Sequence, residues 1–249
     1  MDAASASWAN RLVGNPDAAP VLELAFSGAR LRVLRRSEFA VTGADGDGSH
    51  PRWKSFHAVA GEELAFGRLR AGVWSYVAVQ GGFAAPRWFG SASVNPRAGF
   101  GAALGPGARL FRQEADRQAA VSARFLVESE RPRFAEPTEL PVWPGPEWER
   151  LPDGAREQFL GASWQISSQI DRTGYRLEGA ALAAGLPQIP SAPVAVGVIQ
   201  VPENGQPIVI LRDGPTVGGY PRIAIMDASA VSRMTQCAPA TSVRFRLVS

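Results

Sequence analysis

Three polar, glycine-containing segments in the last third of the chain carry most of the side chains that could bind a ligand. They are D-R-T-G-Y-R-L-E-G (171–179), G-V-I-Q-V-P-E-N-G-Q-P-I-V-I-L (197–211) and D-G-P-T-V-G-G-Y-P (213–221). Each interrupts a strongly apolar stretch, and binding sites are usually built from polar residues in loops and at strand ends of a rigid scaffold. We therefore predict a ligand site in this region.

The arginines of the first segment are suited to a phosphate or carboxylate. If the segment is extended, Arg172, Arg176 and Glu178 project to one face, because their spacing is even. Two guanidinium groups could then hold an anion while Glu178 orients one of them. A surface ion pair is the alternative. Arg97, in the loop N-P-R-A-G-F-G, is a further candidate for anion binding.

The other two segments add amides, hydroxyls and backbone N–H groups. Gln200 and Gln206 flank an expected hairpin, and an amide both donates and accepts, which suits a ligand with its own amide or carboxylate. Alternatively, the two amides satisfy backbone groups of the turn. The N–H groups of Gly218 and Gly219 could converge on an anion. With Tyr175, the substrate-binding candidates are Arg97, Arg172, Tyr175, Arg176, Glu178, Gln200, Gln206, Asp213, Thr216, Gly218, Gly219 and Tyr220.

We expect five of these side chains to surround one shared cleft: Arg172, Arg176, Gln200, Gln206 and Tyr220.

The sequence motifs of several well-known catalytic and binding sites are absent from the chain. The chain has no G-x-S-x-G elbow, no Walker A loop, no dinucleotide-binding glycine motif and no zinc-deaminase pattern. Lys54 is the single lysine and lies in no motif, so Schiff-base and P-loop chemistry are not expected. Cys237 is alone and is interpreted as a small buried hydrophobe, and His50 and His57 have no metal-ligand spacing. We predict no metal site and identify no catalytic residue.

Composition indicates an ordinary globular protein. The 249 residues suffice for one large or two small domains, and 45% are hydrophobic. All but one of the 26 basic residues are arginine, but they are dispersed, so nucleic-acid binding is not expected. No apolar run approaches the ~20 residues that span a bilayer, and the N-terminus has no signal-peptide pattern. We expect a cytoplasmic protein that binds no membrane.

Short strands separated by glycine and polar turns predict a mainly β fold with two β-rich lobes, residues 1–115 and 116–249. Helices are expected at 2–13, from Asp153 to 160 and from Asp227 to 236, with both aspartates as caps. Asn204-Gly205 predicts a hairpin, and residues 89–110 form a long glycine-rich loop. The expected strands are 21–26, 30–34, 39–42, 63–66, 74–79, 119–128, 142–143, 164–168, 194–201, 206–211, 223–226 and 242–248.

These segments also resemble a known family. The runs D-R-x-G-Y-R-L-E-G, G-x-I-Q-V-P-x-x-G-Q-P-I-V and D-x-x-T-x-G-G-Y-P, with N-R-L-V-G-N-P near the start and the loop at 90–101, resemble the biotin-dependent carboxyltransferase family. This family includes the C subunit of 5-oxoprolinase, KipA-like proteins and allophanate hydrolase subunit 2-like proteins, and the resemblance covers nearly the whole chain.

The resemblance implies a C-terminal cyclophilin-like β-barrel with a few short helices. It further implies one component of an ATP-dependent 5-oxoprolinase, an amidohydrolase that opens 5-oxo-L-proline to L-glutamate. Its partners would resemble the A and B subunits of 5-oxoprolinase, and the chain would be inactive alone. The alternatives are a carboxyltransferase acting on a urea-like substrate, with biotin on a partner because no A-M-K-M segment exists here, and a non-catalytic regulatory partner.

The chain departs from the family pattern at polar positions. The expected first strand with its T-x-Q-D-x-G-R-x-G motif is missing, and Ala92, Ala192 and Pro215 replace the usual Arg, Glu and Gln. These departures favour the regulatory alternative.

Overall fold

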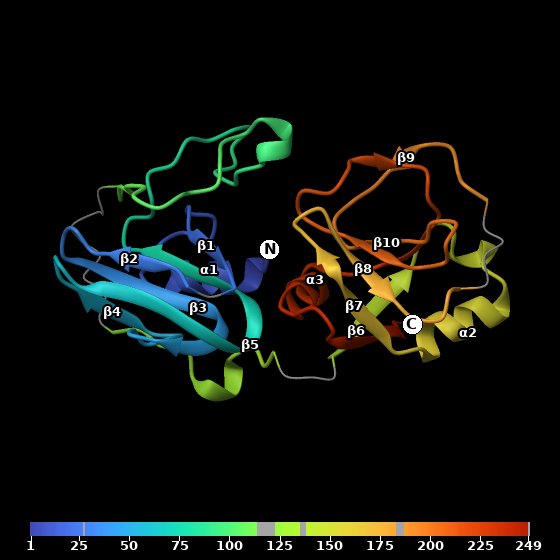
Figure 1. The fold of residues 1–249 in the computed structure, drawn as a ribbon, viewed down its shortest axis with the longest axis horizontal. Coiled ribbons are helices and arrows are strands. Elements are labelled where there is room, and N and C mark those ends of the chain that lie inside the picture. Colours follow the sequence, from blue (N-terminus) through green and yellow to red (C-terminus); the bar gives the residue numbers. More distant parts are fainter. Residues whose placement is uncertain (27, 114–122, 135–137, 183–186, 249) are drawn as a thin grey trace. The chain divides into compact units, whose positions relative to one another are not determined.

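The computed structural model describes residues 1–248 except 27, 114–122, 135–137 and 183–186. The chain divides into two compact units, one formed by Ala3–Arg133 and the other by Phe134–Ser249 together with Met1–Asp2. Both units consist mainly of strands with few helices, which confirms the predicted fold class (Figure 1). No helix of the described residues is long and apolar enough to cross a membrane.

The unit Ala3–Arg133 is a helix-covered sheet with strand order β1-β5-β3-β4, in which β2 also pairs with β5. Its elements are α1 (Ala3–Leu12), β1 (Leu22–Ala25), β2 (Arg30–Arg32), β3 (Ser37–Gly48), β4 (Ser55–Ala58), β5 (Glu63–Val79), η1 (Pro96–Ala98) and η2 (Glu128–Glu130). Helix α1 packs on one face of the sheet through Ala9 and Leu12, which cluster with Tyr76 of β5. A second cluster contains Val41, Val77 and Phe66.

Strand β5 is one strand of 17 residues. The prediction of two separate strands, 63–66 and 74–79, is therefore wrong. Strand β3 carries glycines where the pairing shifts register, between Gly43 and Gly48. A side chain at Gly43 would lie 2.2 Å from the Trp74 carbonyl oxygen, and one at Gly46 2.5 Å from that of Arg68. These bulges bend the hairpin without interrupting it.

The sequence did not predict the edge strand β4. Residues beside and within this strand bond to residues 124–126, which lie past the expected boundary at residue 115. The Ser55 N–H donates to the Arg124 carbonyl (2.8 Å), and the Leu126 N–H donates to that of Trp53 (2.9 Å). The chain therefore remains attached to this sheet after residue 115, and the units divide after Arg133. The predicted strand 119–128 lies partly outside the described residues; its described part contributes one bridge, between Phe125 and Lys54.

The second unit is a closed barrel with strand order β10-β11-β8-β7-β14-β6-β13, drawn in yellow to red in Figure 1. Strands β14 and β6 are parallel, and the other neighbours are antiparallel. Its elements are β6 (Thr138–Pro144), η3 (Trp148–Arg150), α2 (Asp153–Gly161), β7 (Trp164–Ile170), β8 (Gly174–Glu178), β9 (Ala192–Pro193), β10 (Val198–Gln200), β11 (Ile208–Ile210), β12 (Val217–Gly218), β13 (Arg222–Ile225), α3 (Ala228–Thr235) and β14 (Ser242–Leu247).

Burial alternates along the barrel strands, as a filled barrel requires. On β8, Tyr175 and Leu177 are buried, whereas Arg176 and Glu178 are exposed. Helix α2 packs against the barrel through Phe159, whose ring stacks on Phe245 at 4.8 Å. The inward positions of the strands are thus used for packing, and the outward positions are left for binding.

The local signals in this unit are mostly confirmed. Strands β10 and β11 pair as an antiparallel hairpin around Asn204-Gly205, where Gly205 has a φ of 71°. The Asp227 carboxylate accepts from the Ala230 N–H (2.7 Å) and caps α3. Asp153, however, does not cap α2: the cap position is Pro152, and no side chain bonds there.

Candidate functional site

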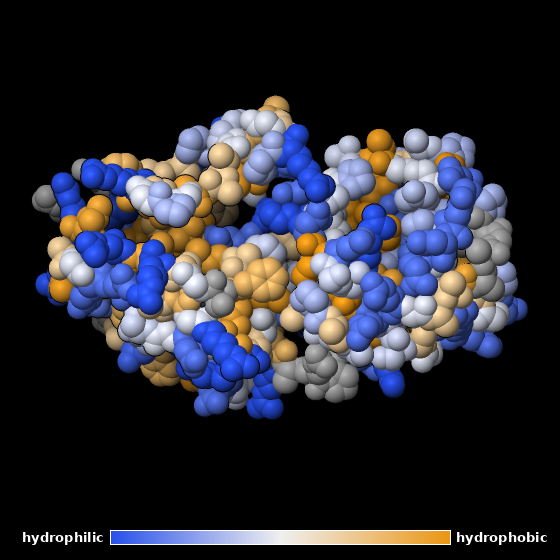
Figure 2. Space-filling view, viewed as in Figure 1, coloured by the Kyte–Doolittle hydropathy of each residue, from blue (hydrophilic) through white to orange (hydrophobic). Residues whose placement is uncertain are grey.

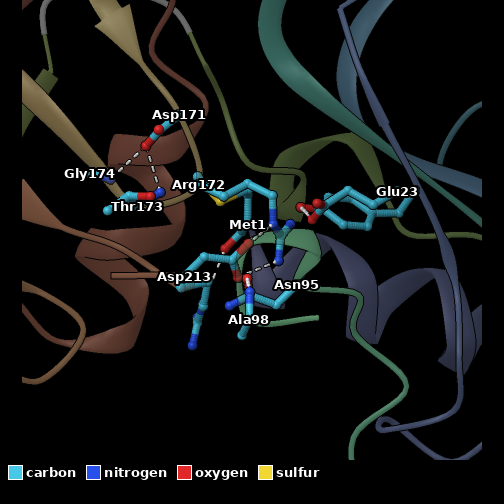
Figure 3. Close-up of polar contacts among 11 residues, drawn as sticks. Met1, Glu23, Asn95, Ala98, Asp171, Arg172, Thr173, Gly174 and Asp213 are labelled. Atoms are coloured by element: carbon cyan, nitrogen blue, oxygen red, sulfur yellow. Dashed lines mark hydrogen bonds and ion pairs between the residues drawn. The ribbon is translucent and has the colours of Figure 1, made fainter. Parts of the chain in front are cut away.

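Arg172 and Asp213 form the first polar contact of the predicted site. Arg172 Nε donates to Asp213 Oδ2 (2.8 Å) and Nη2 donates to Oδ1 (3.2 Å), a two-point pairing. The Asp213 N–H donates to the Arg172 carbonyl (2.8 Å), so the turns before β8 and after β11 are joined. Asp171 Oδ1 accepts from the N–H groups of Thr173 (2.7 Å) and Gly174 (3.1 Å), which fixes this bend (Figure 3).

Arg172, Arg176 and Glu178 of the first segment do not share one face. Arg176 and Glu178 both point outward from β8, but Arg172 lies in the bend before the strand and is paired with Asp213. The expectation that Glu178 orients one of the arginines is therefore wrong for Arg172. The extended geometry that was assumed begins only at Gly174, so the even spacing no longer fixes the direction of Arg172.

A two-stranded layer, which we call the flap, lies over the outside of the barrel and consists of β9 and β12. The Val194 N–H donates to the Thr216 carbonyl (2.9 Å) beside the paired strands. Val194 in turn packs with Val198 of β10 and Ile210 of β11. The segment from Asp213 to residue 221 therefore starts at the Arg172 pair and crosses this outer barrel surface.

Gln200 lies beneath the flap and is 3% exposed. Its Nε2 donates to the Tyr220 carbonyl (3.3 Å). A side-chain carbon at Gly218 would lie 3.0 Å from Gln200 Nε2 and 3.3 Å from a methyl of Val194. Gly218 is thus required for close approach over the amide. Neither Gly218 nor Gly219 has a positive φ, and β12 is extended, so these glycines do not form the turn-like anion nest that was expected.

A second ion pair braces the flap, and the sequence did not predict it. Arg222 Nε and Nη2 donate to the two carboxylate oxygens of Glu147 (3.0 and 2.9 Å), the Arg222 N–H donates to Oε2 (2.9 Å), and Nη1 donates to the Pro193 carbonyl of β9 (2.9 Å). The hydrogen bond from Arg222 holds the pKa of Glu147 below its ordinary value, although desolvation opposes it. The partners are 75 positions apart, so no local sequence signal points to this pair.

The strand register aligns polar residues across the outside of the barrel. Arg176 is opposite Ile208, Ile208 is opposite Gln200, and Gln200 is opposite Arg222. Neighbouring strands are ~4.8 Å apart, so Arg176 and Gln200 lie roughly 10 Å apart along this row. Arg222 is neutralised by Glu147, and no ion pair joins Arg176 to another described residue. Arg176 is therefore the exposed cation of the row.

Two of the predicted residues serve the fold. The Gln206 side chain bonds to both backbone groups of Gly179: Oε1 accepts from its N–H (3.1 Å) and Nε2 donates to its carbonyl (3.0 Å). For Gln206, the structure therefore supports the alternative in which the amide satisfies backbone groups. Tyr175 is fully buried, and its hydroxyl donates to the Thr235 carbonyl (3.0 Å). The alternation that buries Tyr175 was readable in the sequence, since Tyr175 and Leu177 alternate with the charged Arg176 and Glu178.

The remaining predicted residues are spread. Thr216 and Tyr220 are exposed on the flap segment, whereas Arg97 belongs to the other unit, in η1, where Asn95 caps the Ala98 N–H (3.2 Å) (Figure 3). The five side chains expected around one cleft are thus not gathered: Arg172 pairs with Asp213, and Gln206 turns to Gly179. Gln200 and the Tyr220 backbone meet, with Arg176 in the same row.

The chemistry available in this arrangement is binding and orientation. An exposed guanidinium suits a carboxylate or phosphate, and an amide suits a ligand amide. Among the described residues, no group of three His, Cys, Asp or Glu side chains could hold a metal ion.

The chain is similar to a known family of protein domains and to several known proteins. A family model, carboxyltransferase domain, subdomain A and B, matches residues 1–247. The C subunit of 5-oxoprolinase from Escherichia coli is 33% identical over 95% of this chain and 77% of its own length. The crystal structure of TTHA0988 superposes with a TM-score of 0.86 at 31% identity over 98% of this chain, which spans 49% of that chain.

The urea amidolyase of Kluyveromyces lactis has the same fold, with a TM-score of 0.87 at 23% identity, but this chain covers only 17% of it. The family model matches nearly every residue of the chain, and this match shows the family. This chain belongs to the carboxyltransferase domain family, subdomains A and B.

Proposed function

We propose that this chain is the carboxyltransferase-family component of an ATP-dependent 5-oxoprolinase, which hydrolyses 5-oxo-L-proline to L-glutamate together with partners resembling the A and B subunits of that enzyme. The observation that carries the proposal is the similarity to the C subunit of a 5-oxoprolinase over 95% of this chain and 77% of that protein. The similarity to the urea enzyme involves only a small part of a much longer chain.

The chemistry of the substrate is consistent with the residues of the barrel. 5-Oxoproline carries a carboxylate and a ring amide, and the row on the outer barrel surface contains the Arg176 guanidinium and the Gln200 amide. In this proposal Arg176 binds the carboxylate, and Gln200 bonds to the ring amide when the flap moves away from it. The chain then contributes binding and orientation.

The described residues do not fit a nucleotide site of the P-loop type. The single lysine, Lys54, lies at the β4 edge, where it bridges to Phe125. In this proposal ATP is not held by a P-loop of this chain, and the lactam is activated in the assembled complex. Lys54 lies in no A-M-K-M segment, so biotin, where it is used, would be carried by a partner.

The test is reconstitution. The full chain is co-purified with homologues of the A and B subunits, and ADP release is measured with and without 5-oxoproline. Dependence of ADP release on all three chains supports the proposal, and a stable complex with no substrate-dependent release refutes it.

A matched pair of variants tests the barrel site. Arg176→Gln removes a charge-assisted contact worth about 1.5–3 kcal/mol, which corresponds to a KM increase of roughly 10- to 150-fold. Arg244→Gln, an exposed arginine on β14 of the same barrel, should leave KM unchanged. Equal effects of the two variants would remove Arg176 from the site.

Two other functions have specific support. Similarity to the urea amidolyase of Saccharomyces cerevisiae, 26% identical over 98% of this chain and 15% of that protein, favours a carboxyltransferase for a urea-like substrate, which would transfer a carboxyl group from a biotin-bearing partner to urea. Alanine at 92 and 192 and proline at 215 favour a non-catalytic regulatory role. A 1:1 complex with one partner, and no turnover of 5-oxoproline or urea, would identify the regulatory role.

A further inference from the structure

Residues 86–113, which we call the arginine loop, present the most exposed large hydrophobic side chain of the described residues. Phe89 is 96% exposed, and Leu104 and Phe111 of the same loop are exposed as well. An apolar tip stands beside hydrophilic side chains on this loop in the space-filling view (Figure 2). Exposed aromatic side chains grouped with other apolar residues are typical of interaction surfaces.

The turn that carries Phe89 is strained and held in place. Trp88 and Ser91 exchange two backbone hydrogen bonds (2.8 and 2.9 Å), and Arg87 Nη1 donates to the Gly90 carbonyl (2.8 Å). Between them Phe89 has a φ of 50° and Gly90 a φ of 82°. Glycine is suited to this left-handed region, but phenylalanine is not. A strained residue that the surrounding structure holds in place indicates a functional role.

The arginine loop also has its own small cluster of aromatic rings. Asn95 and Phe100 exchange backbone hydrogen bonds (2.7 and 3.0 Å), and the Phe100 ring lies edge-on to Phe89 at 5.7 Å and tilted to Trp88 at 6.3 Å. Gly101 packs against Trp88 so closely that a side-chain carbon there would lie 2.9 Å from the indole. Phe89 is therefore pre-organised, which lowers the entropy that a partner must overcome on binding.

The charge of the arginine loop specifies its partner. The four charged residues in 86–113 are all arginines, at 87, 97, 109 and 112, and all are exposed. Aromatic residues and arginine are the residue types that dominate binding energy in protein interfaces. A complementary surface has an apolar pocket for the Phe89 ring and a rim of aspartate and glutamate.

We propose that the arginine loop docks this chain onto a partner subunit through such an acidic, pocketed surface, with Phe89 as the anchor. This inference rests on the proposed function for the existence of the partner. It goes further by naming the docking surface and its chemistry.

The experiment measures the dissociation constant between the full chain and each partner homologue by biolayer interferometry. Phe89→Ser should weaken one complex at least tenfold. Phe89→Gly should weaken it equally while relieving the turn, so its thermal midpoint should not fall. The matched control is Phe26→Ser, which replaces a half-exposed phenylalanine outside the loop that also has a positive φ, 57°. Arg109→Glu with Arg112→Glu should weaken the complex and reduce its dependence on salt.

The outcomes are separable. Wild-type affinity in Phe89→Gly and Phe89→Ser overturns the docking site and leaves the proposed function standing. A complex that depends on Phe89 but releases no ADP with 5-oxoproline supports the docking site and refutes the proposed function. Absence of any complex with the wild-type chain overturns both, as does arginine-dependent binding to nucleic acid in place of a partner protein.

Discussion

The ion pair that braces the flap can be tested by removing one charge. Glu147→Gln keeps the size of the side chain but turns an NH2 group toward Arg222 Nη2, which now lacks the Oε1 acceptor at 2.9 Å. Breaking a fully buried pair from one side costs about 3–5 kcal/mol. The side chains of Glu147 and Arg222 keep 11% and 16% exposure, so screening by solvent lowers the expected loss to about 2–3 kcal/mol.

The expected change is large enough to measure. For a chain of this size it corresponds to a fall in thermal midpoint of about 4–12 °C. Because Arg222 also holds the Pro193 carbonyl of β9, the flap loosens in the same variant and uncovers Gln200 more readily, so KM for 5-oxoproline should fall in the reconstituted complex.

The pH dependence adds a second measurement. The pKa of Glu147 is lower in the folded chain than its ordinary 4.5, so the stability from the pair is fully present above pH 4.5 and is lost as the pH falls toward the folded pKa. The difference in unfolding free energy between wild type and Glu147→Gln should therefore shrink below pH 4.5.

The control is an exposed pair on the same barrel. Arg246 and Glu139 are 2.8 Å apart with 59% and 60% exposure, so Glu139→Gln should cost only about 0–1 kcal/mol. Comparable losses in Glu139→Gln and Glu147→Gln, or a difference for Glu147→Gln that does not change with pH, would refute the reasoning.

Three single contacts give further predictions. Gly218→Ala should displace the Gln200 amide, 3.0 Å away, and raise KM with little change in thermal midpoint. Tyr175→Phe should lower the unfolding free energy by about 1–2 kcal/mol and leave KM unchanged, because the hydroxyl bonds inside the barrel to Thr235. Burial lowers the pKa of His50 from 6.5, so stability should fall below pH 6.5 as the unfolded chain takes up the proton; His50→Phe should remove that slope in urea titrations.

The fold was readable wherever the signal was local. Asn204-Gly205 predicted the β10–β11 hairpin because only a few residues decide a tight turn, and Asp227 predicted the start of α3. The length of β5 was not readable, since its glycines are typical of turns when they are taken alone. They stay in the strand because β3 bulges opposite them, and the sequence of one strand does not show its partner.

The site was predicted less well, for a related reason. Residue types identified Gln200, Arg172 and Asp213 as polar positions of interest, but not their partners. The Glu147–Arg222 contact joins residues 75 positions apart, and only the closure of the barrel brings them together. Gln206 was likewise identified by its residue type, but its amide bonds to the backbone of Gly179 and is not available to a ligand.

The single long strand β5 has a consequence for synthesis of the protein. Strand β1 bonds to β5 as far as Val77 and strand β3 as far as Val79, so neither pairing can be complete on the ribosome until nearly 80 residues have emerged. At about 5–20 residues per second this takes about 4–16 s. During that interval the apolar faces of the earlier strands remain available to chaperones, and mutations that weaken β5 should reduce the yield of folded protein in cells more than they lower its thermal midpoint.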